Sequence, residues 1–257
     1  MKLMVMISTI LIIFIGCSSK QELKPNQNII QVEKTQTLDD EFSDEFVVED
    51  VSDPFSGYNE IMTGFNDKLI VYIITPLAEG YNFVFHREIR ESVDNFFKNL
   101  NYPTRVINNI LQGKFKNASE ETGRFVINST VGIFGLFNPA KSEFNLALHQ
   151  EDFGQTLGFY GVGAGPHIVL PVFGPSNLRD TISMFPDSYI SFIDYSPRPW
   201  FILTDNVTAF LTVKSYERVN HFSLDIHSYE NLKKDAINLY PYFRNTYEQY
   251  RIKQINE

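Results

Sequence analysis

Residues 53–75 read DPFSGYNEIMTGFNDKLIVYIIT, and this stretch decides the fold class. Asp53 can cap the first turn of a helix, and Pro54 suits the first helical position. Apolar side chains then follow at steps of three and four residues, which places on one helical face Tyr58, Ile61, Met62, Phe65, Leu69 and Tyr72. We predict that this helix ends by Thr75, because Pro76 follows.

Three more helices are predicted downstream from the same spacing, over residues 86–100, 103–112 and 114–131. Pro103 opens the middle helix and Gly113 closes it. Their apolar positions include Ile89, Val93, Phe96, Phe97, Leu100, Phe115, Ala118, Phe125 and Val126. The sequence from residue 53 to residue 131 therefore favours a mainly α fold.

The amino-acid composition changes between residues 139 and 175. Five of the chain's 14 glycines lie within twelve residues here, namely Gly154, Gly158, Gly161, Gly163 and Gly165. Three prolines follow them, at 166, 171 and 175. Because glycine has no Cβ and proline cannot donate to a strand ladder, we predict an irregular or extended segment that approaches another backbone closely.

Helical spacing returns over about residues 199–220, and a polar-aromatic helix is predicted over about 228–254, where Pro241 kinks or splits it. We find no internal repeat and no point at which residues 53–257 divide. No stretch of this body reaches the roughly 20 apolar residues that a membrane-spanning helix needs. The prediction is a single, mainly α domain.

The first 16 residues have the composition of a secretory signal. A charged start precedes an apolar run over 3–15, which is too short to span a bilayer as a helix. FIGC at 14–17 resembles the bacterial lipobox, in which the leader is cleaved before a cysteine that then carries acyl chains. We predict that Cys17 is the lipid anchor. Ser18 rather than Asp after this cysteine resembles the pattern that sends such lipoproteins on to the outer membrane. An ordinary signal peptide with a leftover thiol is the alternative.

An acidic segment follows the anchor. Nine acidic residues against one lysine give residues 33–53 a formal charge of −8, out of −9 for the whole chain. Like charges and low apolar content keep such a stretch from folding, so residues 17–52 are predicted to form a flexible tether. An acidic docking motif is the alternative, and we favour the simple spacer.

Composition excludes some classes of function. The chain has 31 acidic against 22 basic residues and no basic run, so nucleic acid is not an expected partner. A single cysteine excludes an intrachain disulfide and a cysteine-based zinc site. The aromatic residues are numerous, with 23 Phe and 13 Tyr, which indicates either a large core or contact with an apolar partner.

No catalytic motif supports an enzyme. The sequence lacks a Gly-x-Ser-x-Gly elbow, a His-Glu-x-x-His zinc motif and a phosphate-binding P-loop. His221 and His227 flank Asp225, but we favour exposed or satisfied histidines over a metal or proton relay. Glu151 and Asp152 resemble an acid/base pair, yet adjacent carboxylates usually lie on a solvated turn. We therefore predict no catalytic residue, no metal and no cofactor.

Residue strings from 53 to 180 resemble the MlaA family, also called VacJ lipoproteins. The matching strings, in family-like order and spacing, are DPFSGYN at 53–59, FNDKL at 65–69, NFFKNL at 95–100, LQGKF at 111–115, TGRFVINSTVG at 122–132, EDFGQTLG at 151–158, GVG at 161–163 and LRD at 178–180. Beyond Asp180 the match fades.

The resemblance implies a ring-like helical lipoprotein within the periplasmic leaflet of the outer membrane, with a central amphipathic channel. Phospholipids misplaced in the outer leaflet would pass through this channel to a soluble periplasmic carrier, which preserves lipid asymmetry without breaking a bond. The family often associates with trimeric porins. A porin-associated lipoprotein that only supports the envelope is the alternative, and a lipid hydrolase would need a nucleophile that the sequence lacks.

The resemblance also suggests roles for individual residues. Phe65 would act in a gate or be a packed core ring. The segment from Lys141 to Asp152 corresponds to a hairpin-like loop that influences opening, and the five clustered glycines would let this loop flex or would serve plain turn geometry. Arg124, Arg179 and Asp180 would contact lipid headgroups or pair with one another, and we favour the salt bridge. Aromatic rings that would form an apolar rim or a core are Tyr58, Phe65, Tyr72, Phe96, Phe97, Trp200 and Phe201.

Overall fold

The computed structural model describes residues 53–193, 207–234 and 236–257. Cys17, the predicted tether over 17–52, Trp200 and Phe201 lie outside these ranges, as does the start of the helix predicted over 199–220. Most of the described residues are helical, which confirms the mainly α prediction.

The helices and strands run in the following order: α2 (Ser56–Leu69), the π-helical turn η1 (Ile70–Ile74), α3 (Thr75–Val84), α4 (Arg87–Leu100), α5 (Tyr102–Leu111), α6 (Phe115–Thr130), α7 (Pro139–Ser142), α8 (Phe153–Phe159), β1 (His167–Leu170), β2 (Gly174–Asn177), α9 (Leu178–Ile190), α10 (Val207–Leu224), α11 (Ile226–Lys234) and α12 (Leu239–Asn256).

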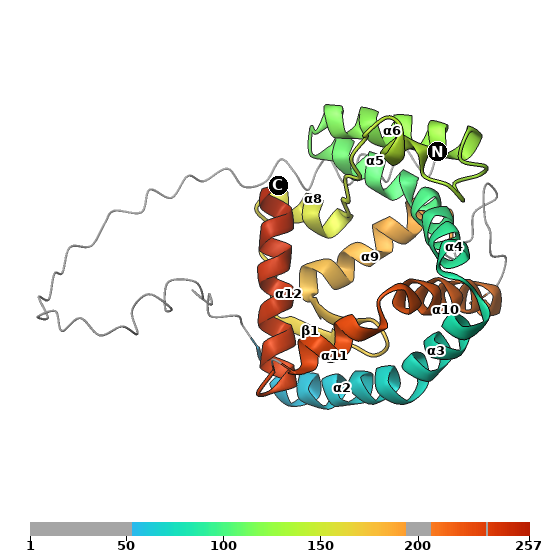
Figure 1. Cartoon of the computed structure of the whole chain (residues 1–257). Coiled ribbons are helices and arrows are strands. Elements are labelled where there is room, and N and C mark those ends of the chain that lie inside the picture. The colour runs from blue at the N-terminus through green and yellow to red at the C-terminus, as the bar shows by residue number, and fades with distance from the viewer. Residues whose placement is uncertain (1–52, 194–206, 235) are drawn as a thin grey trace, which may run out of the picture. The chain divides into compact units, whose positions relative to one another are not determined.

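The first helix continues past Pro76, so its predicted end at Thr75 is wrong. The π-helical turn η1 lies directly before the proline and joins α2 to α3 without a break. A proline inside an α-helix lacks a required N–H, and its ring crowds the carbonyl four residues back. Pro76 lies in the first turn of α3, where the wider π turn changes the hydrogen-bond register and relieves both problems. The result is one long, curved run of helix along an edge of the body (Figure 1).

The next three helices agree with the sequence prediction. α4, α5 and α6 match the predicted ranges within one residue at each end. Gly113 follows α5 with a φ of 74°, the left-handed conformation that ends many helices. Periodicity therefore located these helices correctly.

The segment predicted to be irregular contains more order than expected. Asp152 caps α8, since its Oδ1 accepts a hydrogen bond from the Gln155 backbone N–H at 2.8 Å. Strands β1 and β2 pair antiparallel, from His167 opposite Asn177 to Leu170 opposite Gly174. The high glycine content obscured both a capped helix and a hairpin of two short strands.

The helix predicted over 228–254 consists of two helices, α11 and α12. Pro241 does not cause the division, because it lies in the first turn of α12, where a missing N–H breaks no bond. The side chain of Asn238 caps this helix by accepting a hydrogen bond from the Tyr240 N–H at 3.2 Å.

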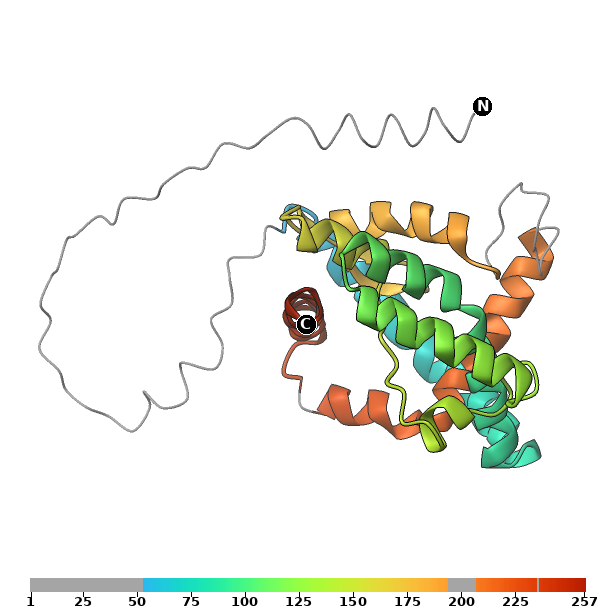
Figure 2. The same cartoon turned by 90° about the horizontal axis from the view of Figure 1, so that it is seen from above.

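Helices from the two ends of the described chain pack against each other. α10 contacts α3 and α4, while α12 contacts α2 and α8. α5 packs along α6, and α8 packs along α9. Figure 2 shows α12 end on, with α9 and α11 on opposite faces of the body. These contacts close the body on itself and bring side chains from distant parts of the sequence together.

Candidate functional site

The interior of this body is unusually polar. Among the described residues, buried polar or charged side chains outnumber buried apolar ones. The buried polar positions on three of the helices are Asn59, Thr63 and Asn66 on α2, Glu121, Arg124 and Asn128 on α6, and Arg179, Asp180 and Ser183 on α9. Buried polar groups are costly unless they are hydrogen-bonded, so such an interior requires specific partners.

The exterior is correspondingly apolar. On the α2–α3 run, Ile61 is 68%, Tyr72 74% and Phe83 93% exposed. A second apolar stripe follows α9 at helical spacing and consists of Leu178, Ile182, Phe185 and Tyr189. A buried polar set beneath exposed apolar faces is the reverse of the arrangement expected for a protein surrounded by water.

The structure distinguishes between the two roles that the sequence allowed for the aromatic rings, an exposed apolar rim and a buried core. Tyr58, Phe65 and Tyr72 are exposed, whereas Phe97 is buried and Phe96 lies between the two classes. The apolar face predicted for the first helix therefore points outward, and the polar face points inward. No helix among the described residues is long and apolar enough to cross a membrane.

Two asparagines on the inner face of α2 bind the free edge of β1. Asn59 donates to the His167 carbonyl at 3.0 Å and accepts from the Val169 N–H at 2.8 Å. Asn66, two turns further on, donates to the Leu170 carbonyl at 2.9 Å and accepts from the N–H of Val172 at 2.7 Å. Backbone groups that would otherwise be unsatisfied in the interior are thereby paired.

A cavity of about 500 Å³, lined mostly by polar and basic residues, lies among α4, α5, α6 and α7 and the loop that follows α7. Four basic side chains line it, each from a different helix: Lys98, Arg105, Arg124 and Lys141. Five asparagines add amide groups, and the apolar part of the lining comes from Leu146, Ala147 and Leu148. Its size falls within the range of small-molecule sites in proteins.

Carboxylates balance these basic side chains only in part. Arg105 Nε donates to Glu121 Oε2 at 2.6 Å, and Arg124 Nε lies 3.8 Å from the other oxygen of the same carboxylate. Lys98 Nζ lies 2.6 Å from Asp94 Oδ2. Within the described residues, Lys141 has no ion-pair partner. The cavity therefore has an excess of positive charge.

Arg124 is the one of these four basic residues that keeps a buried side-chain N–H without a hydrogen-bond partner in the described structure. Its Nη1 donates to the Leu146 carbonyl and its Nη2 to Asn138 Oδ1 at 3.4 Å, but the buried Nε has no hydrogen-bond partner within the described residues. Burial lowers the pKa of the Arg124 guanidinium, and the nearby positive charge of Arg105 lowers it further, against the opposing effect of Glu121. A buried donor left unsatisfied costs about 1–3 kcal/mol.

The predicted hairpin-like segment from Lys141 to Asp152 forms one wall of this cavity. After α7 it contains no strand in the described structure. It is held to α6 at two points, because Arg124 donates to the Leu146 carbonyl and the His149 N–H donates to Glu121 Oε1 at 2.7 Å. Asn145 adopts a φ of 51°, which turns the chain just before these two points.

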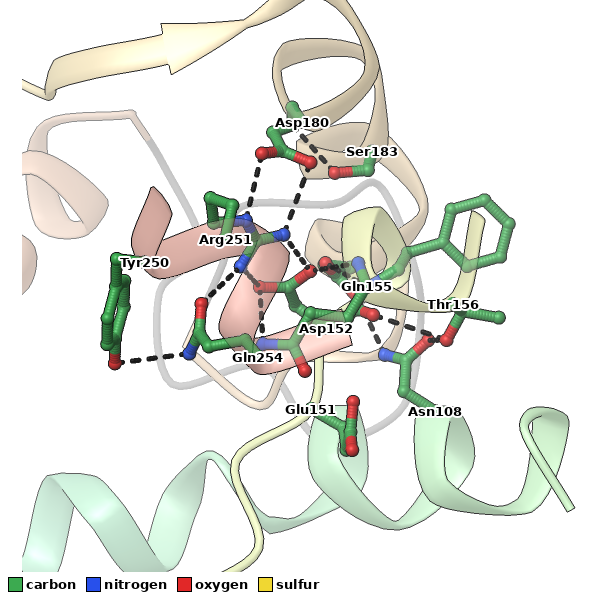
Figure 3. Close-up of polar contacts among 12 residues, drawn as sticks. Asn108, Glu151, Asp152, Gln155, Thr156, Asp180, Ser183, Tyr250, Arg251 and Gln254 are labelled. Atoms are coloured by element: carbon green, nitrogen blue, oxygen red, sulfur yellow. Dashed lines mark hydrogen bonds and ion pairs between the residues drawn. The ribbon is translucent and has the colours of Figure 1, made fainter. Parts of the chain in front are cut away.

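A second charged cluster connects α8, α9 and α12 and is shown in Figure 3. Arg251 Nη1 lies 2.7 Å from Asp152 Oδ2, and its Nε lies 2.9 Å from Asp180 Oδ2. Asp180 also pairs with the Arg179 Nε at 2.9 Å and accepts from the Tyr247 hydroxyl at 2.8 Å. Despite burial, these donors hold the pKa of Asp180 below its usual value, and the two carboxylates hold the pKa of Arg251 above its own.

Asp187 stabilises the start of α8 from the neighbouring helix α9. Its carboxylate accepts the Phe153 N–H at 3.0 Å and the Asn108 amide at 3.0 Å. Burial raises the pKa of Asp187 to about 6, and the hydrogen bond from Phe153 opposes this shift only in part. This carboxyl group therefore takes up a proton at a higher pH than an ordinary aspartate does.

The five candidate glycines occupy different environments. Gly154 and Gly158 lie within α8, where added Cβ atoms would collide with Asp180 Oδ1 and with Ile255 respectively. Gly161 and Gly165 adopt φ angles of 84° and 70°, while Gly163 has open space around it. Close packing thus explains the first two, and turn conformation explains Gly161 and Gly165.

The remaining sequence candidates separate in space. Arg124 lies at the basic cavity, while Arg179 and Asp180 pair with each other in the α8–α9–α12 cluster. Glu151 forms an ion pair with Lys114 at 2.7 Å, whereas Asp152 forms one with Arg251 at 2.7 Å. His221 hydrogen-bonds Asp94 at 2.8 Å, and His227 lies 3.8 Å from Glu230. Among the described residues, no group of histidines and carboxylates is arranged to hold a metal ion.

Sequence reasoning missed three of the four basic residues that line the cavity. Lys98 belongs to the string NFFKNL at 95–100, but nothing in that string indicates that it would face Arg124. Arg105 and Lys141 lie seven and 43 positions further along the chain, on other helices. Only the folded arrangement of α4 to α7 brings these charges to one cavity.

The fold and this site define a class of protein: a mainly helical body with a polar interior, an apolar exterior and an excess of positive charge around one cavity. The model of the MlaA lipoprotein family matches residues 51–254, and the chain belongs to this family.

Individual proteins are similar to parts of this chain. An uncharacterised protein of Rickettsia prowazekii is 37% identical over 157 residues, which cover 61% of this chain and 60% of the relative. The intermembrane phospholipid transport system lipoprotein MlaA of Escherichia coli K12 is 35% identical over 133 residues, or 50% of this chain and 53% of that one. The aligned regions thus span between half and two thirds of the length of these relatives.

A solved structure shares the fold. It is described as "Structural basis for maintenance of bacterial outer membrane lipid asymmetry", and it is 29% identical in sequence. The similarity has a TM-score of 0.65 and covers 80% of this chain and 100% of the other.

Proposed function

We propose that this protein is an outer-membrane lipoprotein that moves misplaced phospholipids from the outer leaflet toward the periplasm, and so helps to maintain lipid asymmetry. In this proposal Cys17 anchors the chain in the periplasmic leaflet and residues 17–52 form the tether. Lipids pass through a central amphipathic channel in the body to a soluble periplasmic carrier. No bond is broken, so the process requires no catalytic residue.

The observation that carries this proposal is the inverted distribution of polar and apolar side chains. Each exposed ring such as Phe83 or Phe185 would cost about 25 cal/mol for each Å² of apolar surface left in water. Within a lipid leaflet this cost disappears, because acyl chains surround the ring. Helices suit that depth because they satisfy their backbone groups internally. The polar interior then offers a path for a charged headgroup.

The relatives support the same process. The Escherichia coli relative is named as a lipoprotein of an intermembrane phospholipid transport system, and the related solved structure is described in terms of bacterial outer-membrane lipid asymmetry. These descriptions belong to the other proteins, and we extend them to this chain on the strength of shared family and fold.

Gating in this proposal involves Phe65 and the loop from Lys141 to Asp152. Phe65 is 47% exposed on the outward face of α2, and the loop forms a wall of the basic cavity. Gly161, Gly163 and Gly165 lie between α8 and β1 and would permit movement of the adjoining segments. Association with a trimeric porin would hold the body at its depth in the leaflet.

The test measures phospholipid in the outer leaflet by selective labelling of intact cells from which the gene has been deleted. The gene is then restored as the native form or as Cys17→Ala. We expect deletion to raise surface phospholipid, and only the native form to reverse the change. Unchanged surface phospholipid with altered porin levels or envelope stiffness would refute transport and favour the porin-associated support role. Release of fatty acid would instead indicate an enzyme.

A further inference from the structure

Four basic side chains converge on one cavity from four consecutive helices. Lys98 comes from α4, Arg105 from α5, Arg124 from α6 and Lys141 from α7. The carboxylates that contact them are Asp94 and Glu121, and both are shared with other partners. Asp94 Oδ1 also binds His221 at 2.8 Å, while Glu121 serves two arginines and a backbone N–H. The positive charge of this cavity is therefore not fully neutralised by the carboxylates that contact it.

The donors in this site match an oxyanion with several acceptor oxygens. Arg124 keeps a buried Nε without a hydrogen-bond partner in the described structure, and Lys141 keeps its ammonium without an ion pair there. Asparagine amides surround these groups and add neutral donors at 95, 99, 128, 138 and 145. Phosphate oxygens accept charge-assisted hydrogen bonds from guanidinium and ammonium groups, and such bonds are about twice as strong as neutral ones.

We propose that this cavity binds a phosphate-bearing anion. In its most specific form, the anion is the phosphodiester of a phospholipid headgroup, and this form of the inference rests on the proposed function. Free inorganic phosphate shares the same chemistry.

Side chains next to the cavity favour the lipid as the source of the phosphate. Phe137 precedes the lining residue Asn138 and is 55% exposed, and Phe144 precedes Asn145 and is 57% exposed. Within the cavity lining, the apolar residues are Leu146, Ala147 and Leu148. A molecule with an anionic end in the cavity and acyl chains along these outer rings would satisfy both surfaces.

The binding experiment uses the full chain, purified in a non-ionic detergent. Dihexanoyl phosphatidylglycerol is the lipid probe, inorganic phosphate is the headgroup-only probe, and dihexanoyl glycerol is the tail-only probe. Isothermal titration calorimetry measures the affinity of each. We expect phosphatidylglycerol to bind, inorganic phosphate to compete with it, and dihexanoyl glycerol to bind at least tenfold more weakly.

Two variants locate the site. Lys141→Gln removes the basic group that has no ion pair, so we expect phosphatidylglycerol affinity to fall about tenfold without loss of folding. Arg124→Gln removes the buried donor, and we expect a larger fall in a variant whose circular dichroism confirms that it is folded. Lys116→Gln is the matched control, because Lys116 lies on α6 with an 87% exposed side chain and does not line the cavity.

Each outcome decides the proposal. Native affinity in both the Lys141 and Arg124 variants, or equal binding of the tail-only probe, would overturn it. Binding of inorganic phosphate without binding of phosphatidylglycerol would support a phosphate site and overturn the lipid form of the proposal.

Transport is judged separately in cells. If deletion raises surface phospholipid and Lys141→Gln restores asymmetry fully, the cavity proposal fails while the transport proposal stands. If deletion has no effect on surface phospholipid, the transport proposal fails whatever the calorimetry shows.

Discussion

Arg251 and Arg124 are both buried, at 7% and 6% exposed, but they differ in how their charges are met. Arg251 lies between two carboxylates, Asp152 and Asp180, and the structure provides every part of its guanidinium with an acceptor. Arg124 shares Glu121 with Arg105, and its Nε has no hydrogen-bond partner among the described residues. Arg251 thus joins α8, α9 and α12, whereas Arg124 lines the basic cavity with one N–H that the described structure leaves unsatisfied.

The comparison predicts that stability and ligand binding depend on different arginines. Around Arg251, two basic and two acidic side chains balance, and the packing is close enough to exclude a Cβ at Gly154. Around Arg124 there is a cavity of about 500 Å³ in place of such packing. Four substitutions test whether stability and ligand binding are separated in this way.

The largest expected effect is that of Arg251→Met. Removing Arg251 from this buried charge network leaves Asp152 without its ion-pair partner in the described structure and Asp180 with Arg179 as its remaining one, which costs about 3–5 kcal/mol. The free energy of unfolding, from urea titration in detergent followed by circular dichroism, should fall by that amount. Lys253→Met is the control, since the Lys253 side chain is 74% exposed on the same helix. Equal losses in the two variants would show that the cluster does not join α8, α9 and α12.

The next effect concerns Asp187, the one carboxyl group in that region whose pKa is raised. A folded-state pKa of about 6 lies above the ordinary value, so the contribution of this group to stability is present at low pH and is lost as pH rises through 6. Asp187→Asn keeps the acceptor for the Phe153 N–H and removes the titration. Between pH 4 and pH 8 the variant should gain on the order of 2–3 kcal/mol of stability relative to the native protein. Parallel stability curves for the two proteins would contradict this account of the shift.

A smaller effect is expected from Gly154→Ala. The new Cβ would overlap Asp180 Oδ1 and lie 2.8 Å from Arg251 Nη2, and such overpacking costs about 1–3 kcal/mol. Gly163→Ala is the matched control, because nothing lies within 4 Å of its Cβ position. Thermal melting of the two variants should separate them clearly. A similar melting temperature for both would mean that α8 can move away from the charged cluster at little cost.

The smallest effect on stability is expected from Lys141→Gln at the basic cavity. Lys141 is exposed and has no ion pair within the described residues, so the free energy of unfolding should change by no more than about 0.5 kcal/mol. Urea titration under the conditions used for Arg251→Met provides the comparison. A loss as large as that of Arg251→Met would show that Lys141 is needed for stability. The basic cavity and the Arg251 cluster would then not differ in their contribution to folding.

The positions of the helices could largely be predicted from sequence. Apolar residues at steps of three and four located α4, α5 and α6 within one residue, because this periodicity follows from helix geometry. The end of the first helix could not be predicted, since a π-helical turn allows Pro76 to continue it. Periodicity also leaves the direction of a face open: it groups Ile61 with Phe65, but the same pattern suits a core and an outer surface in lipid.

The two charged clusters could be predicted from sequence less well than the helices. Arg124, Arg179 and Asp180 were candidates as a group, and the structure assigns the first to one cluster and the other two to another. Arg251 pairs with residues 99 and 71 positions away, and no local pattern indicates such a contact. The pairing of Arg179 with Asp180, by contrast, joins neighbours in sequence, and the salt bridge that we favoured is the contact observed.

The asparagines of α2 affect how this protein behaves toward other copies of itself. A strand at the edge of a sheet is a template on which a second chain can add, and a pair of four-residue strands is too small to be stable alone. Asn59 and Asn66 occupy the backbone groups of His167, Val169, Leu170 and Val172 that a recruited strand would need. Side-chain amides spaced two helical turns apart thus take the place of a third strand at the β1 edge, where they block the pairing of a second chain.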